Sequence, residues 1–123
     1  MLGRLRAAGV RIGVVSDVHV DIRPAFAAAG LGGLVDAVTL SVEQGVQKPD
    51  PRMFTRTLDV LGVHPAEALV VGDRPGPDGG AVEAGITTLL LPPLRGPHDR
   101  RLDRVLALCG LSAPGRWVGP APR

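Results

Sequence analysis

Large aromatic residues are almost absent from this 123-residue sequence, which has no tyrosine, two phenylalanines and one tryptophan. Because 45% of the residues are hydrophobic, the core must be built mainly from Ala, Val and Leu. A single cysteine, Cys109, excludes an internal disulfide and is typical of a protein of the reducing cytoplasm. No apolar run approaches the roughly 18 residues needed to span a bilayer, so the sequence predicts no membrane partner.

A strong charge imbalance is also lacking, since 14 Lys and Arg residues face 12 Asp and Glu residues. The arginines are scattered along the chain rather than clustered, and this pattern argues against a nucleic-acid partner. Only one of the 14 cationic residues is a lysine, Lys48. A lysine carries a compact point charge where arginine carries a planar fork, so Lys48 is either a candidate site residue or an ordinary surface lysine.

Helical and strand patterns alternate along the chain through short loops. Apolar runs rich in β-branched residues predict strands at Val10 to Val15, Ala37 to Leu40, Ala68 to Val71 and Ile86 to Leu91. Capping residues and helical spacing predict helices at Leu2 to Ala8, Pro24 to Ala29, Pro51 to Leu61, Asp78 to Ala84 and Asp99 to Leu108. This order predicts an α/β fold with a parallel sheet. Residues 1–111 would form that domain, and the Pro- and Gly-rich residues 112–123 a flexible tail.

Polar and charged side chains follow three of the predicted strands. Ser16 and Asp17 follow the first strand, Lys48 lies in the loop after the second, and Asp73 and Asp78 follow the third. The carboxyl ends of parallel strands meet at one edge of a sheet, where α/β folds bind ligands. A hydroxyl and an ammonium suit a phosphate group, and carboxylates suit a hard cation such as Mg²⁺. The sequence therefore predicts a phosphate and Mg²⁺ site at this edge.

Three segments resemble, in order and at plausible spacings, the second, third and fourth motifs of the haloacid dehalogenase (HAD) superfamily of hydrolases. They are Val14-Val-Ser-Asp17, Gly45-Val-Gln-Lys-Pro-Asp-Pro51 and Val70-Val-Gly-Asp-Arg-Pro-Gly-Pro-Asp78. The resemblance covers nearly the whole chain to about Leu94. It implies a Rossmann-like fold and a Mg²⁺-dependent hydrolase, most often a phosphatase of small phosphorylated metabolites and less often a dehalogenase, that works through a phospho-aspartyl intermediate.

The resemblance also implies a role for each residue at the sheet edge. Ser16 and Lys48 would act on the phosphoryl group, Ser16, Asp17 and Lys48 would bind the substrate, and Asp73 supported by Asp78 would hold Mg²⁺. Asp17 stands where many family members have Asn. Its extra negative charge weakens phosphate binding unless Arg or Mg²⁺ offsets it.

The first motif of the family, a strand followed by Asp-x-Asp, is not found upstream of Ser16. In the family this strand supplies the nucleophile and lies at the centre of the sheet, and the specificity-determining cap that follows it is absent too. Without the central strand, the strands ending at Ser16 and Asp73 would lie about 9.6 Å apart, twice the normal spacing. Either they close together, or another chain donates a strand, or this sequence is a fragment whose true start lies upstream. We favour the fragment and expect the isolated chain to be inactive.

Two other functions remain open on the sequence. A non-catalytic binding or interaction module would keep the edge residues without turnover. A receiver-type signalling domain also pairs a lysine with carboxylates, but there the lysine ends a late strand, whereas Lys48 precedes a helix. Partners would be the small phosphorylated substrate, together with a second copy of the chain or a missing N-terminal segment that completes the exposed half-sheet.

Overall fold

The computed structural model describes residues 2–96 and 99–111, so the tail expected at 112–123 lies outside the described residues. Parallel strands are β1 (Gly13–Ser16), β2 (Ala37–Leu40), β3 (Leu69–Gly72) and β4 (Thr87–Leu90). The α-helices are α1 (Leu2–Ala7), α2 (Arg23–Ala28), α3 (Ser41–Gln44), α4 (Pro51–Leu61), α5 (Pro75–Gly79) and α6 (Asp103–Leu108). Short 3₁₀ helices are η1 (Gly32–Leu34), η2 (Pro65–Glu67) and η3 (Gly80–Ala84). The predicted α/β class is confirmed.

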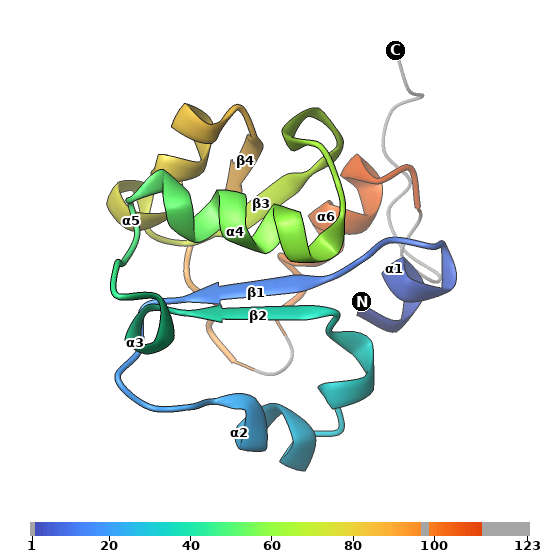
Figure 1. Cartoon of the computed structure of the whole chain (residues 1–123). Coiled ribbons are helices and arrows are strands. Elements are labelled where there is room, and N and C mark those ends of the chain that lie inside the picture. Colours follow the sequence, from blue (N-terminus) through green and yellow to red (C-terminus); the bar gives the residue numbers. More distant parts are fainter. Residues whose placement is uncertain (1, 97–98, 112–123) are drawn as a thin grey trace.

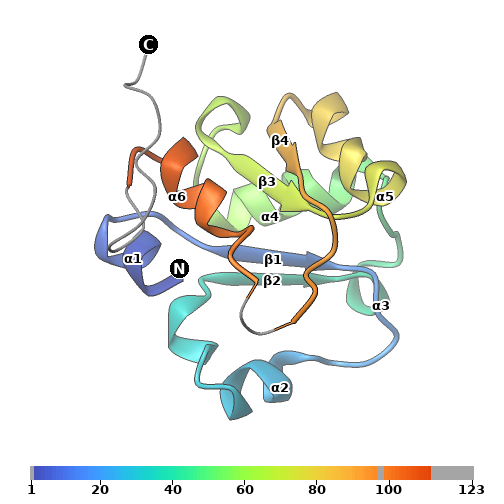
Figure 2. The ribbon, with the colours of Figure 1, turned by 180° about the vertical axis from the view of Figure 1, so that it is seen from behind.

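The four described strands form two separate two-stranded sheets rather than one. In the first sheet β1 pairs in parallel with β2, Gly13 opposite Ala37 and Ser16 opposite Leu40. In the second, β3 pairs in parallel with β4, and Leu69 lies opposite Thr87. Figures 1 and 2 show the order β2, β1, β3, β4 across the molecule, with β1 and β3 as facing neighbours. The expected gap between these two strands is therefore present, and they have not closed onto one another.

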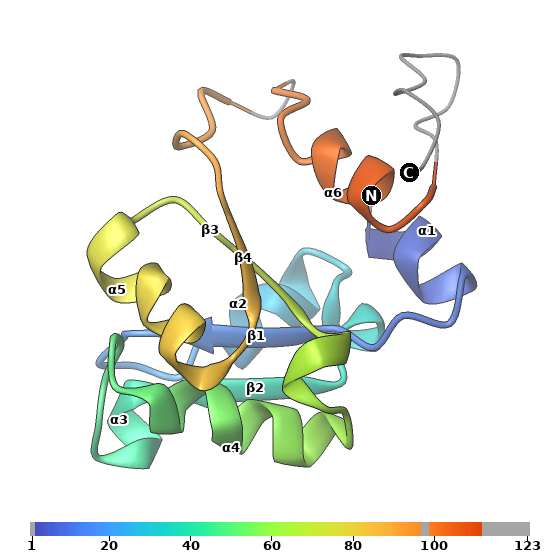
Figure 3. The ribbon, with the colours of Figure 1, turned by 90° about the horizontal axis from the view of Figure 1, so that it is seen from above.

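Helices cover the strands from both sides. Helix α4 lies on one side, and α1 and α6 lie on the other, as the two opposite views show (Figures 1 and 2). Seen from above, α3 and α5 lie at one end of the molecule and α1 and α6 at the opposite end (Figure 3). Because β1 runs toward α3 and α5, the loops after the strands gather at that end. This arrangement places the predicted site residues together.

Two hydrophobic clusters take the place of a single core. On the α4 side the buried residues Phe54, Leu58, Ala81 and Ile86 pack with Val15 of β1 and Val70 of β3. On the α6 side the buried residues Leu5, Val105 and Leu106 pack with Ile12 and Leu69. The first cluster is thus contacted from both two-stranded sheets, here called half-sheets, and the second from β3 and from Ile12, which directly precedes β1. No strand pairing joins β1 to β3 in the described part of the chain. The two half-sheets are therefore connected by apolar side-chain packing and not by backbone hydrogen bonds between β1 and β3.

Helix α4 has the bounds that the sequence predicts. Asp50 accepts a hydrogen bond from the backbone N–H of Arg52, Pro51 takes the first helical position, and Gly62 ends the helix in the left-handed conformation. The side chain and backbone N–H of Arg52 lower the pKa of Asp50 to about 2, so this cap stays ionised at neutral pH. The helix buries Met53 and Phe54 and so fixes the loop that carries Lys48 just before it.

Other predicted boundaries shift for local reasons. The first strand begins at Gly13 rather than Val10, because the carboxylate of Asp36 binds the backbone N–H of Ile12 in place of a strand partner. The last helix begins at Asp103 rather than Asp99, because Asp99 forms a turn by accepting the N–H of Arg101. The segment predicted as one helix from Asp78 to Ala84 is divided between α5, which already begins at Pro75, and η3. Helix α3, which follows β2 directly, was predicted as loop.

Among the described residues, no helix is both long enough and apolar enough to cross a membrane.

Candidate functional site

The predicted site residues do meet at the carboxyl ends of β1 and β3. Ser16 is the last residue of β1 and Asp17 follows it, while Asp73 follows β3. Lys48 lies between α3 and α4, and Asp78 lies within α5. A chain of hydrogen bonds connects four of these five residues.

The ion pair between Lys48 and Asp78 is at the centre of this chain. The ammonium Nζ of Lys48 donates to Oδ1 of Asp78 at 2.5 Å. Only 14% of the Lys48 side chain and 8% of the Asp78 side chain are exposed. Charges this buried remain stable only when they are paired and hydrogen-bonded. The interaction therefore ties the loop after β2 to the segment after β3.

The second oxygen of Asp78 holds the turn that follows β3. Oδ2 accepts the backbone N–H groups of Asp73 and Arg74, each at 3.1 Å. Gly72 allows this approach, because a Cβ at that position would come within 2.3 Å of the same carboxylate oxygen. Burial alone would raise the pKa of Asp78, but the hydrogen bonds from Lys48 and from the backbone lower it below its ordinary value. Asp78 is accordingly a carboxylate with both oxygens engaged.

Asp17 connects the first strand to the same loop. Its Oδ1 accepts the backbone N–H of Lys48 at 2.9 Å. Lys48 is thus held through its main chain by the segment after β1 and through its side chain by the segment after β3. The carboxyl ends of β1 and β3 are consequently fixed at the same end of the molecule, and the two half-sheets share one strand direction.

Two residues that help to form the site were missed by sequence reasoning. The hydroxyl of Ser41 bonds both the N–H of Val18, at 2.9 Å, and its carbonyl oxygen, at 3.0 Å, and so shapes the loop after Asp17. A serine directly after a strand is the signal that singled out Ser16, and it could have singled out Ser41. Gly80 packs so closely on the Lys48 loop that a Cβ there would lie 2.3 Å from the carbonyl oxygen of Pro49. No local sequence pattern predicts that contact.

The carboxylates at this edge are the residues that could bind a metal ion. Between residues 2–96 and 99–111, no group of three or more His, Cys, Asp or Glu side chains is arranged to hold one. Asp73 is exposed at the edge, whereas Asp78 already uses both oxygens on Lys48 and the backbone. Mg²⁺ is commonly held by one or two carboxylates completed by water and phosphate oxygens. Of the two predicted metal ligands, Asp73 is the one left available for such a role, and the described residues do not by themselves form a complete Mg²⁺ site.

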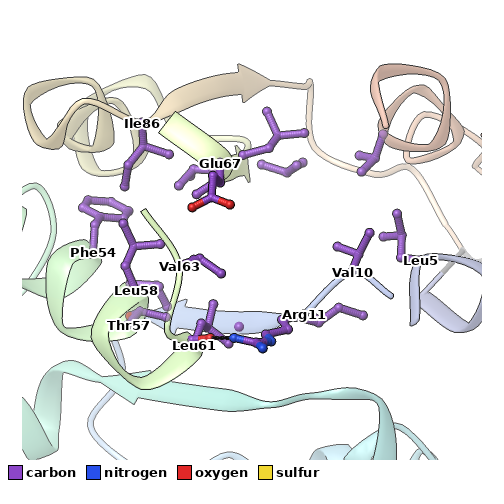
Figure 4. Close-up of a pocket in the computed structure, with 18 of the residues that line it drawn as sticks. Leu5, Val10, Arg11, Phe54, Thr57, Leu58, Leu61, Val63, Glu67 and Ile86 are labelled. Carbon is purple, nitrogen blue, oxygen red and sulfur yellow. Dashed lines mark hydrogen bonds between the residues drawn. The ribbon is translucent and has the colours of Figure 1, made fainter. Parts of the chain in front are cut away.

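A cavity of about 750 Å³ opens between the two half-sheets. Figure 4 shows Phe54 and Ile86 on one side of it and Leu5 and Val10 on the other. Lys48 and Asp78 line it at the carboxyl ends of the strands, and Arg11 and Glu67, close to their amino ends, also line it. The site residues therefore stand at one end of an apolar cavity.

Comparison with known proteins gives consistent matches. Residues 1–85 match the family model of haloacid dehalogenase-like hydrolases. The chain is 38% identical over 87 residues to a phosphoserine phosphatase of Thermus thermophilus, covering 69% of this chain and 35% of the relative. It is 38% identical over 90 residues to a glyceraldehyde 3-phosphate phosphatase of Methanopyrus kandleri, covering 72% and 39%. A crystal structure of a HAD phosphatase from Thermococcus onnurineus superposes with a TM-score of 0.77 at 28% identity, covering 90% of this chain and 55% of that one.

The chain spans between a third and two fifths of the length of these two curated relatives. The matched part includes all five predicted site residues, since the family model extends over residues 1–85.

Proposed function

Because this chain belongs to the haloacid dehalogenase-like hydrolases, we propose that it carries the phosphate-binding part of a Mg²⁺-dependent phosphatase site for a small phosphorylated metabolite. The observation that carries the proposal is the hydrogen-bonded chain from Asp17 through Lys48 and Asp78 to Asp73. It holds the ammonium of Lys48 at the end of the molecule where Ser16 ends β1 and the exposed Asp73 follows β3. Two relatives named as phosphatases of small phosphate esters support the substrate class.

Each residue has a role that its contacts allow. Ser16 donates a hydrogen bond to a phosphoryl oxygen, and Lys48 neutralises charge on the phosphoryl group and on the attacking carboxylate. Asp17 faces the substrate from the same loop and holds Lys48 in place. Asp73 provides the carboxylate for Mg²⁺, and Asp78 supports it by fixing the turn that carries it. When bound, the metal ion would supply charge neutralisation at the phosphoryl oxygens.

The net charge of the site residues explains why phosphate binding at the carboxyl ends of the strands would need a bound cation. Among the five predicted site residues, Asp17, Asp73 and Asp78 carry three negative charges against the one positive charge of Lys48. A phosphate dianion entering this edge would be repelled, and like charges separated by 4 Å repel by about 1 kcal/mol even in bulk water. A divalent cation held by Asp73 would balance the surplus of two negative charges among these residues.

The nucleophile must come from outside the residues that this chain provides. The sequence contains no Asp-x-Asp, and Asp78 is engaged by Lys48 and the backbone. We assign the attacking carboxylate to a strand that enters beside Lys48, either from an N-terminal segment or from another chain. The missing motif also favours a second candidate function, a HAD-fold module that binds Mg²⁺ and phosphate without turnover.

Hydrolysis of p-nitrophenyl phosphate with and without Mg²⁺ distinguishes the two functions. We expect no turnover by this chain alone and Mg²⁺-dependent turnover by a polypeptide extended with the sequence that precedes Met1 in its reading frame. Calorimetric titration of both proteins with inorganic phosphate provides the matched binding measurement. Phosphate binding without turnover by the extended protein would support the non-catalytic module instead.

Replacing Asp17 with asparagine should tighten binding of inorganic phosphate in the presence of Mg²⁺, by something on the order of fivefold to tenfold. The asparagine oxygen still accepts the N–H of Lys48, while one negative charge near the phosphate is removed. Asp17→Ala is the matched control, because it removes both the charge and the acceptor and frees the Lys48 loop. Calorimetry gives the two dissociation constants. Weaker binding by Asp17→Asn would mean that the carboxylate itself recognises the ligand.

A further inference from the structure

Arg56 joins the end of α3 to the middle of α4. Its guanidinium nitrogen Nη1 donates to the backbone carbonyl oxygen of Gln44 and to the side-chain oxygen Oε1 of the same residue, each at 3.1 Å. Gln44 is the last residue of α3, and Arg56 lies 12 positions further along, in the second turn of α4. Both residues are half-buried. The two hydrogen bonds therefore close the segment that carries Lys48 into a ring.

This ring supports Lys48 from the side that precedes it in the sequence. The start of α3 is held by Ser41, whose hydroxyl bonds to the backbone of Val18. The last carbonyl groups of a helix have no partner within it and need one from elsewhere. Arg56 is such a partner for Gln44, and it so determines where the chain leaves α3 on its way to Lys48.

Arg56 also acts on the other end of the same loop. Asp50 caps α4, and hydrogen bonds from Arg52 lower its pKa to about 2 with a further contribution from the positive charge of Arg56. A single guanidinium thus binds the residue before the loop and favours the ionised cap after it. Residues 45–50 are consequently fixed at both ends.

We propose that Arg56 is a positioning residue for Lys48, whose bonds to Gln44 keep the Lys48 ammonium on Asp78 at the carboxyl ends of β1 and β3. The main chain of Lys48 is bound by Asp17 and its ammonium by Asp78. A loop with fixed ends has fewer conformations, so less entropy is lost when Lys48 makes both contacts. The effect on catalysis rests on the proposed function, whereas the placement of the ammonium does not.

The alternative is that Arg56 only stabilises the packing of α3 on α4. In that case the loss of Arg56 would expose Lys48 through global unfolding. A positioning residue acts within the folded protein, where its loss lets residues 45–50 move locally. The two routes differ in their dependence on urea, because global unfolding exposes far more surface than the movement of one loop.

Acetylation of Lys48 measures its placement directly, because it is the sole lysine of the chain. Only 14% of its side chain is exposed and its ammonium is paired, so it should react slowly in the full chain. In Arg56→Met we expect acetic anhydride to modify Lys48 roughly fivefold faster, the factor that corresponds to losing one ordinary hydrogen bond. Mass spectrometry of the peptide that contains Lys48 gives the rate, and the ratio to wild type should stay constant in low concentrations of urea.

Two further variants make the test specific. Arg104→Met makes the same replacement at an exposed position of α6 and should leave the rate unchanged. Gln44→Ala removes one of the two acceptors of Arg56, so it should accelerate acetylation less than Arg56→Met and add little to it in the double variant. Any one of three results would overturn the proposal: an unchanged rate in Arg56→Met, an acceleration that rises with urea as steeply as global unfolding, or an equal acceleration in Arg104→Met.

The catalytic consequence is measured on the extended protein that hydrolyses p-nitrophenyl phosphate. Arg56→Met should lower kcat about tenfold and leave KM nearly unchanged, because a displaced ammonium loses most where negative charge increases in the transition state. Unchanged kcat in an active extended protein would overturn this consequence. Absence of turnover by the extended wild type would count against the proposed function alone, since acetylation of the full chain still decides whether Arg56 positions Lys48.

Discussion

Replacing Asp78 with asparagine should lower the free energy of unfolding by about 3 kcal/mol, the scale for removing one partner of a buried ion pair. The change leaves an acceptor for the backbone N–H groups of Asp73 and Arg74 but removes the charge that balances Lys48. Both side chains of the pair are largely shielded from water, so the unpaired ammonium is left poorly solvated. Urea denaturation followed by circular dichroism measures the loss.

The matched control is Asp59→Asn, which removes the same charge from an exposed position on α4 and should change stability little. Adding Lys48→Met to Asp78→Asn should restore part of the lost stability, because the second change removes the unpaired charge. Strict additivity of the two single changes would contradict a coupled pair.

This contribution should also depend on pH in a definite direction. The pKa of Asp78 lies below its ordinary value of 3.8, so the folded protein binds this proton less readily than the unfolded chain. The stabilisation is therefore complete above about pH 4 and is lost as the pH falls through the lowered pKa. The difference in stability between the wild type and Asp78→Asn should shrink in the same acidic range.

Sequence reasoning succeeded where local chemistry determines the structure. The bounds of α4 followed from Asp50, Pro51 and Gly62, since a cap, a first-turn proline and a left-handed glycine act within a few residues of the helix ends. It failed where a distant side chain intervenes. The start of β1 depends on Asp36, which replaces a strand partner for Ile12 from 24 residues away.

The candidate site shows the same division. The order of strands and polar residues was enough to place Ser16, Asp17, Lys48, Asp73 and Asp78 at one edge, because parallel strands bring their carboxyl ends together. The pairing of Lys48 with Asp78 was not predictable, since it depends on how α5 turns back toward the α3–α4 loop. The gap beside β1 was predicted from the missing first motif and not from any pattern in the residues that are present.

Replacing Lys48 with methionine should reduce phosphate ester hydrolysis by a factor of about 100 to 1,000, once the missing strand is supplied and the protein turns over substrate. In the proposed site the ammonium is the one positive charge among the five residues at the edge, and it stands where negative charge on the phosphoryl group increases. Methionine keeps a similar length and removes the charge. The rate constant at saturating substrate and Mg²⁺ is the quantity to compare, normalised to the folded fraction of each protein.

Lys48→Arg is the informative control, because it keeps a positive charge but changes its shape. The Lys48 side chain is largely shielded from water, with its ammonium 2.5 Å from Asp78 and its main chain bound by Asp17. A planar guanidinium cannot occupy that position and still present one compact donor to the phosphoryl group, so arginine should restore little activity. Full activity in the arginine variant would mean that the site needs only net charge. Full activity in the methionine variant would remove Lys48 from the catalytic site and leave it the structural role of joining the two half-sheets.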